Sequence, residues 1–146
     1  MAALDVLIRA DILNLVKSLT GDLEITFLSI SHDLSVVAHI CDHVTVMYLG
    51  QIVEIAPTKQ LFANTRHPYT KALLSVVPDL DPDAEQTATK LEGEIPSPIN
   101  PPPGCKFHTR CPFAQDRCKT AEPEWREIDD DHFVSCHFAD ELALYH

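Results

Sequence analysis

The sequence predicts an α/β fold followed by a small, loop-rich module that contains most of the cysteines. Over residues 1–77, short β-branched apolar runs alternate with segments of helical periodicity. Residues 78–104 are rich in proline and acidic side chains, and residues 105–146 hold four of the five cysteines. A strand–helix–strand order builds an α/β sheet, and proline-rich stretches without periodicity are typical of linkers. We therefore expect an α/β segment, a linker and a cysteine-rich metal-cluster module over these three ranges.

The first thirty residues predict a helix and then a buried strand. Apolar residues recur at helical spacing from Ile8 to Leu19, and Gly21 stands where glycine often ends a helix. The run ITFLSI, residues 25–30, is short, apolar and rich in β-branched side chains. Such a run is typical of a strand that is buried on both faces.

The next segment predicts a helix, a β-hairpin and two further helices. These elements are a helix over 33–43, strands over 44–49 and 51–56, and helices over 58–64 and 67–77. Gly50 favours a tight turn between the two strands, and Pro68 suits the first position of the last helix. Three strands are few for a buried parallel sheet. Residues 1–77 are therefore expected to be the second half of a larger α/β domain.

Charge and hydropathy exclude two classes of protein. The formal net charge is -11, whereas a nucleic-acid surface needs clustered Lys and Arg. The N-terminus lacks the basic region of a secretory signal, and no run approaches the roughly 20 apolar residues that cross a bilayer. We expect a cytosolic chain, in which clustered cysteines bind metal more often than they form disulfides.

Two residues of the α/β segment are candidates for ligand contacts. His32 follows the predicted strand at 25–30, and ligands of open α/β folds bind at the carboxyl ends of strands. Its imidazole could donate to a phosphate oxygen, although an ordinary loop histidine fits the pattern as well. Asp5 precedes the first helical repeat and could simply cap that helix.

The cysteine spacing leaves the type of metal open. Cys105, Cys111, Cys118 and Cys136 are separated by five, six and seventeen residues. Structural zinc sites usually bring ligands in pairs two to four residues apart, and the spacing also differs from the common ferredoxin patterns. Four thiolates fit a zinc ion or an iron–sulfur cluster, and disulfides or free thiols remain alternatives. Cys41 lies in an apolar helix and is expected to be a buried core residue.

Other side chains near these cysteines affect the prediction. His108, His132 and His137 could complete a mixed Cys/His zinc site. The module also contains cationic side chains, namely Lys106, Arg110, Arg117 and Lys119. Nearby cations are expected to lower the thiol pKa values and so favour the thiolate form that binds metal. A module this small also benefits from a metal because it buries little apolar surface.

Three long stretches carry a family resemblance. They are ALDVLIRADILNLVKSL, TFLSISHDLSVVAHICDHVTVMYLGQIVEIAPTKQLFANTRHPYTKALLSVVP and LEGEIPSPINPPPGCKFHTRCPFAQDRC. In this order they resemble the C-terminal part of an ATP-binding subunit of an ABC transporter, in the oligopeptide/dipeptide importer group that includes nickel importers. SHDL is general to ABC ATPases, whereas HPYTKALL and EGEIPSPINPPPGC are specific to this group. The resemblance implies the C-terminal part of a P-loop NTPase domain.

The resemblance implies a role for individual residues. Ala3, Leu4 and Asp5 match the D-loop, which contacts the opposing nucleotide-binding subunit. His32 matches the switch histidine, which contacts the γ-phosphate of Mg-ATP. Cys105, Cys111, Cys118 and Cys136 match implied ligands of a [4Fe–4S] cluster, with zinc as the alternative.

The chain lacks several motifs of the whole family domain. It contains no GxxxxGK[ST] phosphate loop (Walker A), no LSGGQ-type signature and no Walker B carboxylates. Phosphoryl transfer depends on these parts for positioning and charge stabilisation. The chain by itself is therefore expected to be inactive as an ATPase and to be a fragment of such a subunit.

The resemblance also implies partners and a location. They are a second ATP-binding subunit, two membrane permeases and, indirectly, an extracytoplasmic peptide-binding protein, with the chain peripheral on the cytoplasmic face of the membrane. The alternative is a stand-alone, non-enzymatic module that binds metal or another protein. The first hypothesis predicts exposed apolar surface over residues 1–56, whereas the second predicts a monodisperse fold.

Overall fold

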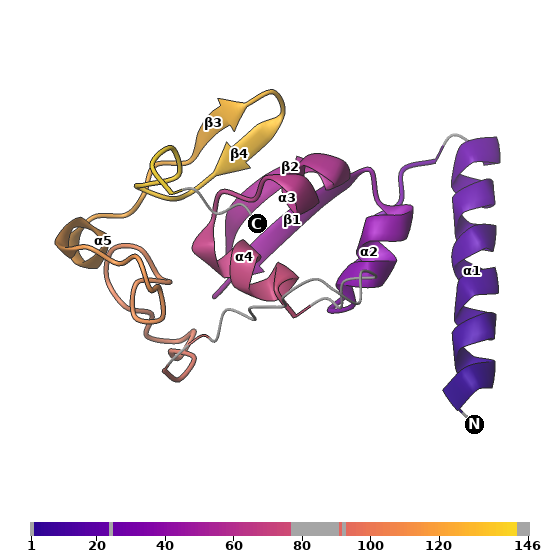
Figure 1. Ribbon diagram of the computed structural model, residues 1–146, viewed down its shortest axis with the longest axis horizontal. Helices are drawn as coiled ribbons and strands as arrows, with labels where there is room; N and C mark the ends of the chain where they lie inside the picture. Colours follow the sequence, from indigo (N-terminus) through magenta and orange to yellow (C-terminus); the bar gives the residue numbers. More distant parts are fainter. Residues whose placement is uncertain (1, 24, 77–90, 92, 143–146) are drawn as a thin grey trace, which may run out of the picture. The chain divides into compact units, whose positions relative to one another are not determined.

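The structure, a computed structural model, describes residues 2–23, 25–76, 91 and 93–142. The chain divides into two compact units, residues 1–41 and 42–146 (Figure 1). Much of the linker predicted over 78–104 lies outside the described residues. Within the described residues, no helix has the length and apolar character that a membrane span requires.

The first unit contains two helices, α1 (Ala2–Leu23) and α2 (Leu34–Ile40). The prediction that Gly21 ends the first helix is wrong, because α1 continues to Leu23. Glycine inside a helix costs only about 1 kcal/mol, which one turn of flanking helix can offset. The N-terminus of α2 is capped by Asp33, whose carboxylate accepts a hydrogen bond from the Val36 amide at 3.3 Å.

The strand predicted over 25–30 is absent from the structure. The chain between Ile25 and Ile30 has no strand pairing, and its large apolar side chains are exposed. A strand exists only when its N–H and C=O groups pair with a neighbouring strand, and the described residues of this unit provide none. The apolar run therefore lacks the partner that its sequence pattern requires.

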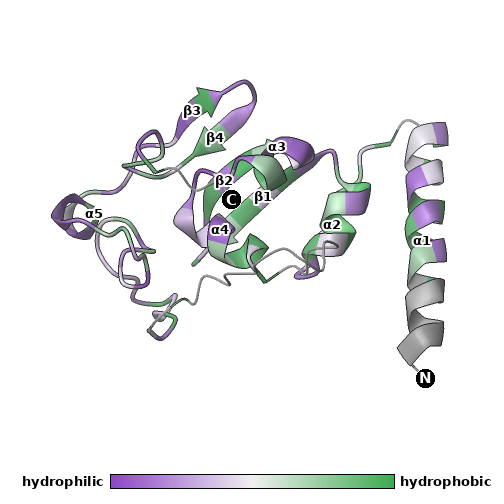
Figure 2. Cartoon of the chain, in the orientation of Figure 1, coloured by the Kyte–Doolittle hydropathy of each residue, from purple (hydrophilic) through white to green (hydrophobic). Residues whose placement is uncertain are grey.

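One face of α1 is also apolar and uncovered. Its exposed apolar side chains are Ile8, Ile12, Leu15, Leu19 and Leu23. In Figure 2 the coloured part of α1 carries both hydrophobic and hydrophilic residues. A surface helix usually turns such a stripe towards a core, so this unit presents more apolar surface than its two helices can bury.

The second unit is built on one four-stranded sheet. Its strands are β1 (His43–Tyr48), β2 (Gln51–Pro57), β3 (Arg126–Asp129) and β4 (His132–Val134), in the spatial order β1-β2-β4-β3. All pairs in this sheet are antiparallel, which corrects the strand–helix–strand arrangement expected from the sequence. The mixture of helices and strands agrees with the predicted α/β class, but β1 and β2, like β3 and β4, are joined by tight turns that leave no room for a helical crossover.

The β1–β2 hairpin has the turn that its sequence indicates. Tyr48 pairs with Gln51, so Leu49 and Gly50 form a two-residue loop with φ values of 46° and 76°. Positive φ at both central positions defines a type I′ turn, which matches the twist of the flanking strands. Alternate side chains of β1 then point into the core.

Three short helices complete this unit. They are α3 (Thr58–Ala63), α4 (Pro68–Leu74) and α5 (Asp116–Thr120). Leu61 of α3 and Ala72 of α4 are buried, and α3 contacts both β1 and β2 (Figure 1). The same core receives Phe107, which is 1% exposed, and Val134 of β4. Residues from the cysteine-bearing part of the chain therefore share a core with the hairpin.

Candidate functional site

The residues predicted to contact nucleotide all lie in the first unit. Ala3, Leu4 and Asp5 lie within the first turns of α1, whereas the sequence had suggested that they precede it. His32 is exposed in the loop before α2. The Ser31 hydroxyl accepts a hydrogen bond from the Asp33 amide at 3.0 Å. This contact shapes the loop locally and leaves the His32 side chain in solvent.

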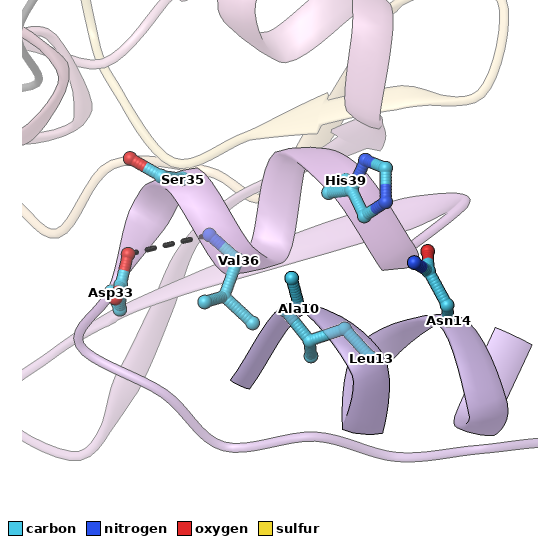
Figure 3. A pocket seen from close by; sticks show the side chains of 7 residues that line it. All are labelled: Ala10, Leu13, Asn14, Asp33, Ser35, Val36 and His39. Atoms are coloured by element: carbon cyan, nitrogen blue, oxygen red, sulfur yellow. Dashed lines mark hydrogen bonds between the residues drawn. The ribbon is translucent and has the colours of Figure 1, made fainter. Parts of the chain in front are cut away.

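A hollow of about 410 Å³ lies between α1 and α2 (Figure 3). Ala10, Leu13 and Asn14 line it from α1, and Val36 and His39 face them from α2. His32 does not line this hollow. The hollow therefore adds no ligand contact to the predicted switch residue.

The second candidate site is the set of four C-terminal cysteines. Cys118 is buried on α5, and Cys105, Cys111 and Cys136 are partly buried in the turns around it. All five cysteines of the chain are described, and each is a free thiol. Cys41 is only partly buried, which corrects the expectation of a core position. The structure thus contains no disulfide among these cysteines.

Burial, and not cationic neighbours, controls three of these thiols. Burial, with a smaller contribution from the negative charges of Cys105 and Cys118, raises the pKa of Cys111 to about 11. Burial, with smaller contributions from the other three cysteines, raises the pKa of Cys136 to about 12. The pKa of Cys105 is raised in the same way. The expectation that Lys and Arg side chains lower these values is wrong, because desolvation disfavours the thiolate more strongly.

Nearby backbone amides act against this rise. The amides of Phe107 and His108 act to lower the pKa of Cys105, and the His108 amide donates to the Cys105 carbonyl at 3.0 Å. The amide of Phe113 acts to lower the pKa of Cys111, and that of Phe138 the pKa of Cys136. Donors aimed at sulfur stabilise a thiolate, and such bonds are among the features that tune iron–sulfur centres. These amides offset only part of the cost of a thiolate, because burial still leaves the pKa of each of these thiols raised.

The backbone holds two of these cysteines close together. The Cys105 amide donates to the Cys118 carbonyl at 2.8 Å. Gly104 precedes this contact with φ +66, and a Cβ atom there would lie 2.5 Å from the Cys118 carbonyl oxygen. Only a residue without a side chain permits this approach.

The histidines near the cysteines make other contacts. His108 Nδ1 contacts the Cys105 carbonyl at 2.8 Å, and His137 Nε2 contacts the Ala121 carbonyl at 2.9 Å. His132 Nε2 contacts the Glu54 carboxylate. Among the residues that the structure describes, no three His, Cys, Asp or Glu side chains are arranged to hold a single metal ion. A mixed Cys/His zinc site has no geometric support here.

Glu54 is a central residue that the sequence analysis does not single out. It lies in β2, is fully buried, and accepts four hydrogen bonds. Oε1 accepts from the Arg66 amide at 2.6 Å and from His132 Nε2 at 2.8 Å; Oε2 accepts from the Thr65 hydroxyl at 3.0 Å and the His67 amide at 3.2 Å. Burial alone would raise the Glu54 pKa, but hydrogen bonds from His132 and from the Arg66 amide help to hold it below its usual value. A lone glutamate inside the apolar run QIVEIA was the available signal, because a buried charge must be paired.

His67 is a neutral imidazole in the same region. It is 1% exposed, and its Nδ1 accepts a hydrogen bond from the Tyr69 amide at 3.1 Å, which caps α4. Burial lowers its pKa to about 4, with the Glu54 charge opposing this shift. Its ring lies 5.6 Å from that of Phe107.

The stability of the chain is expected to fall on acidification because of His67. Between its ordinary pKa of 6.5 and the folded value of about 4, the unfolded chain binds a proton that the folded chain does not. Glu54 stays ionised over that window because its pKa is lowered. The unfolding free energy should therefore drop by about 2 kcal/mol between pH 7 and pH 5 from this residue alone.

Urea unfolding of the wild type and of His67→Asn at both pH values measures this contribution. Asparagine can still cap α4 but does not titrate. The drop should be smaller in the variant by about 2 kcal/mol, and equal drops in the two proteins would contradict the assignment.

Comparison with known proteins identifies the class. Residues 53–118 match the family described as "Oligopeptide/dipeptide transporter, C-terminal region". A putative peptide import ATP-binding protein of Brucella ovis is 53% identical over 136 residues, which are 93% of this chain and 43% of that protein. The dipeptide transport ATP-binding protein DppF of Haemophilus influenzae is 48% identical over 96% of this chain and 43% of its own length.

A third relative comes from Bacillus subtilis. The putative oligopeptide transport ATP-binding protein YkfD of Bacillus subtilis is 48% identical over 94% of this chain and 42% of its own length. The chain thus resembles the C-terminal part of ATP-binding subunits of ABC transporters, and it belongs to the oligopeptide/dipeptide transporter family. It spans less than half the length of these curated relatives.

Proposed function

We propose that this chain forms the C-terminal part of the ATP-binding, energy-coupling subunit of a peptide-type ABC importer. The observation that carries this proposal is the similarity to three peptide-transport ATP-binding proteins over more than nine tenths of the chain. The exposed apolar face of α1 and the unpaired run 25–30 support it. Both are surfaces that the remainder of an ATPase domain would cover.

In this proposal, the first unit contributes to a nucleotide site completed by other parts of the subunit. His32, exposed before α2, would donate to the γ-phosphate of Mg-ATP, and Ala3, Leu4 and Asp5 would face a second ATP-binding subunit. The complete subunit would act on membrane permeases that receive peptide from an extracytoplasmic binding protein. It would lie peripherally on the cytoplasmic face of the membrane.

Joining this chain to the preceding part of Haemophilus influenzae DppF tests the role of His32. The chimera should release phosphate from ATP, and His32→Ala should lower the turnover by about 100-fold, as expected when a donor to the transferred phosphoryl group is lost. The chain alone should show no turnover. His39→Ala, which changes an exposed histidine on α2, should leave the rate of the chimera unchanged.

Two results would contradict the proposal. The first is a chimera whose turnover is the same with and without His32. The second is phosphate release by the chain alone that disappears in His32→Ala.

We further propose that Cys105, Cys111, Cys118 and Cys136 bind a [4Fe–4S] cluster with a structural role. The donor set fits this group, because the unit offers four free thiols, one buried and three partly buried, and the backbones of Cys105 and Cys118 are joined at 2.8 Å. A four-iron cluster takes one thiolate per iron, so its ligands stand farther apart than those of a single zinc ion. The bound cluster would replace the repulsion between thiolates with coordination, and Phe107, Phe113 and Phe138 would donate their amides to the ligand sulfurs.

Anaerobic treatment of the chain with ferrous iron and sulfide tests the metal centre. We expect about four irons and four sulfides per chain. Cys111→Ser and Cys136→Ser should each lower the iron content strongly, because each removes a ligand. Cys41→Ser is the matched control and should bind the full amount. A colourless protein that takes up one zinc and no iron would contradict the cluster assignment.

A further inference from the structure

Besides the short β2–β4 ladder, the cysteine-bearing residues make two buried side-chain contacts with the rest of their unit. The first is the ring of Phe107, whose centroid lies 5.2 Å from that of Tyr48, 5.4 Å from Tyr69 and 5.6 Å from His67. The second is His132, whose Nε2 lies 2.8 Å from Glu54 Oε1, with both side chains fully buried. Aromatic pairs add to the free energy of burial, and removing the partner of a buried, hydrogen-bonded carboxylate is costly because the carboxylate is left unpaired.

Both contacts lead to one short segment, Thr65–Tyr69, which we call the docking segment. Phe107 packs against its rings, and His132 is linked to it through Glu54. Its Thr65 hydroxyl and its Arg66 and His67 amides donate to Glu54. Its His67 and Tyr69 rings hold Phe107. The docking segment therefore contacts the sheet through backbone amides and the cysteine-bearing residues through rings.

Glu54 Oε1 links the docking segment directly to β4. This oxygen accepts both the Arg66 amide and His132 Nε2. A shift of His132 away from Glu54 would leave Oε1 with the Arg66 amide as the remaining donor of the two. The position of the Glu54 carboxylate would then be less fixed. The two hydrogen bonds that share an acceptor are therefore expected to depend on each other.

The two contact points are also close in sequence to two of the cysteines. Phe107 follows Cys105 by two residues. His132 begins β4, and Cys136 follows two residues after that strand ends. Between them, the Ser135 amide donates to the Val53 carbonyl at 2.9 Å. The β2–β4 ladder is short, with Glu54 opposite Val134 and Ile55 opposite Phe133. The Glu54–His132 hydrogen bond therefore adds a buried side-chain link to this short ladder.

We propose that the docking segment and Glu54 form a platform for the cysteine-bearing residues, and that metal loading of the cysteines is transmitted to this platform through His132. The inference rests on the metal centre proposed above. A metal that binds only the folded arrangement stabilises every contact on which that arrangement depends. Loading should therefore hold Cys136 and β4 in place, keep His132 on Glu54, and reduce local opening of the docking segment.

Amide hydrogen exchange of the chain, before and after anaerobic loading with ferrous iron and sulfide, measures this transmission. Loading should slow exchange of the Arg66 and His67 amides by about ten-fold or more, because exchange reports local opening. The Val36 amide, which donates to Asp33 in the other unit, should not change. Iron and sulfide are measured on the same samples.

Variants at His132 show whether the effect passes through this residue. His132→Leu removes the donor to Glu54 and should abolish the slowing at Arg66 and His67 while iron still binds. The side-chain amide of His132→Gln can donate to Glu54, so this variant should keep the slowed exchange at Arg66 and His67. His43→Leu is the control, since it removes an exposed pair with Asp131 at 2.6 Å and should leave the slowing intact. If His132→Leu does not fold, Phe107→Leu tests the other contact point and should lose the slowing at His67.

The outcomes separate this inference from the metal proposal. Iron binding with unchanged exchange at the docking segment, or full slowing in His132→Leu, overturns the transmission and leaves the metal centre intact. Absence of bound iron in the wild type overturns both. Slowing in the wild type, in His43→Leu and in His132→Gln, with none in His132→Leu, supports the transmission.

Discussion

Replacing Glu54 with alanine is expected to lower the unfolding free energy of the chain by about 4 kcal/mol, because a buried acceptor of four hydrogen bonds is lost. The donors left without a partner come from Thr65, Arg66, His67 and His132. Each orphaned buried donor costs about 1–3 kcal/mol. Water entering the vacated space would satisfy some of them, so the total stays below the sum.

Urea unfolding monitored by circular dichroism measures this loss. Glu122→Ala is the control, because Glu122 is an exposed carboxylate in the same unit and its loss should cost less than about 0.5 kcal/mol. Glu54→Gln keeps the shape of the side chain and one acceptor oxygen. It should lower the unfolding free energy by an amount between those of Glu54→Ala and Glu122→Ala. A loss below about 1 kcal/mol for Glu54→Ala would show that the carboxylate does not hold these segments together.

Gly104→Ala is expected to cost about 3–4 kcal/mol, because the new methyl group meets backbone atoms that cannot easily move. Its Cβ would lie 2.5 Å from the Cys118 carbonyl oxygen and 2.9 Å from the Lys119 carbonyl carbon. Relieving this clash would separate Cys105 from Cys118, whose backbones are joined at 2.8 Å. The substitution should therefore also lower the iron content after anaerobic loading.

Gly50→Ala provides the matched control for this substitution. Gly50 also has a positive φ, of +76, but a Cβ atom there would meet nothing within 4 Å. Gly50→Ala should lower the unfolding free energy by about 1 kcal/mol, which is the cost of the left-handed conformation alone. The difference in unfolding free energy between Gly104→Ala and Gly50→Ala measures the cost of the steric clash at Gly104. Equal losses in the two variants would contradict the predicted clash.

Local patterns in the sequence predicted the hairpin and the helices near it well. The strands expected over 44–49 and 51–56 agree with β1 and β2 to within one residue, because Gly50 and the alternation of apolar residues act over a few neighbours. The helix expected to start at Pro68 is α4. Turn chemistry, capping and periodicity are short-range effects, which a sequence displays directly.

The sequence did not show which strands pair with segments far away in the chain. The run 25–30 looked like a strand but has no partner among the described residues. The short strands β3 and β4 were not expected, since they carry charged and polar residues such as Glu127 and His132. A strand is defined by what lies beside it, so its sequence pattern is necessary but not sufficient.

The sequence by itself determined the family of this chain, the local elements around Gly50 and the residues that could act as ligands, because these depend on residue identity and short spacing. The tertiary structure alone decided how those residues are used. It pairs His132 with Glu54 and not with the cysteines, and it raises the thiol pKa values that neighbouring cations were expected to lower. Burial and pairing arise between segments far apart in the chain, and the cost of an unpaired buried charge selects the partner.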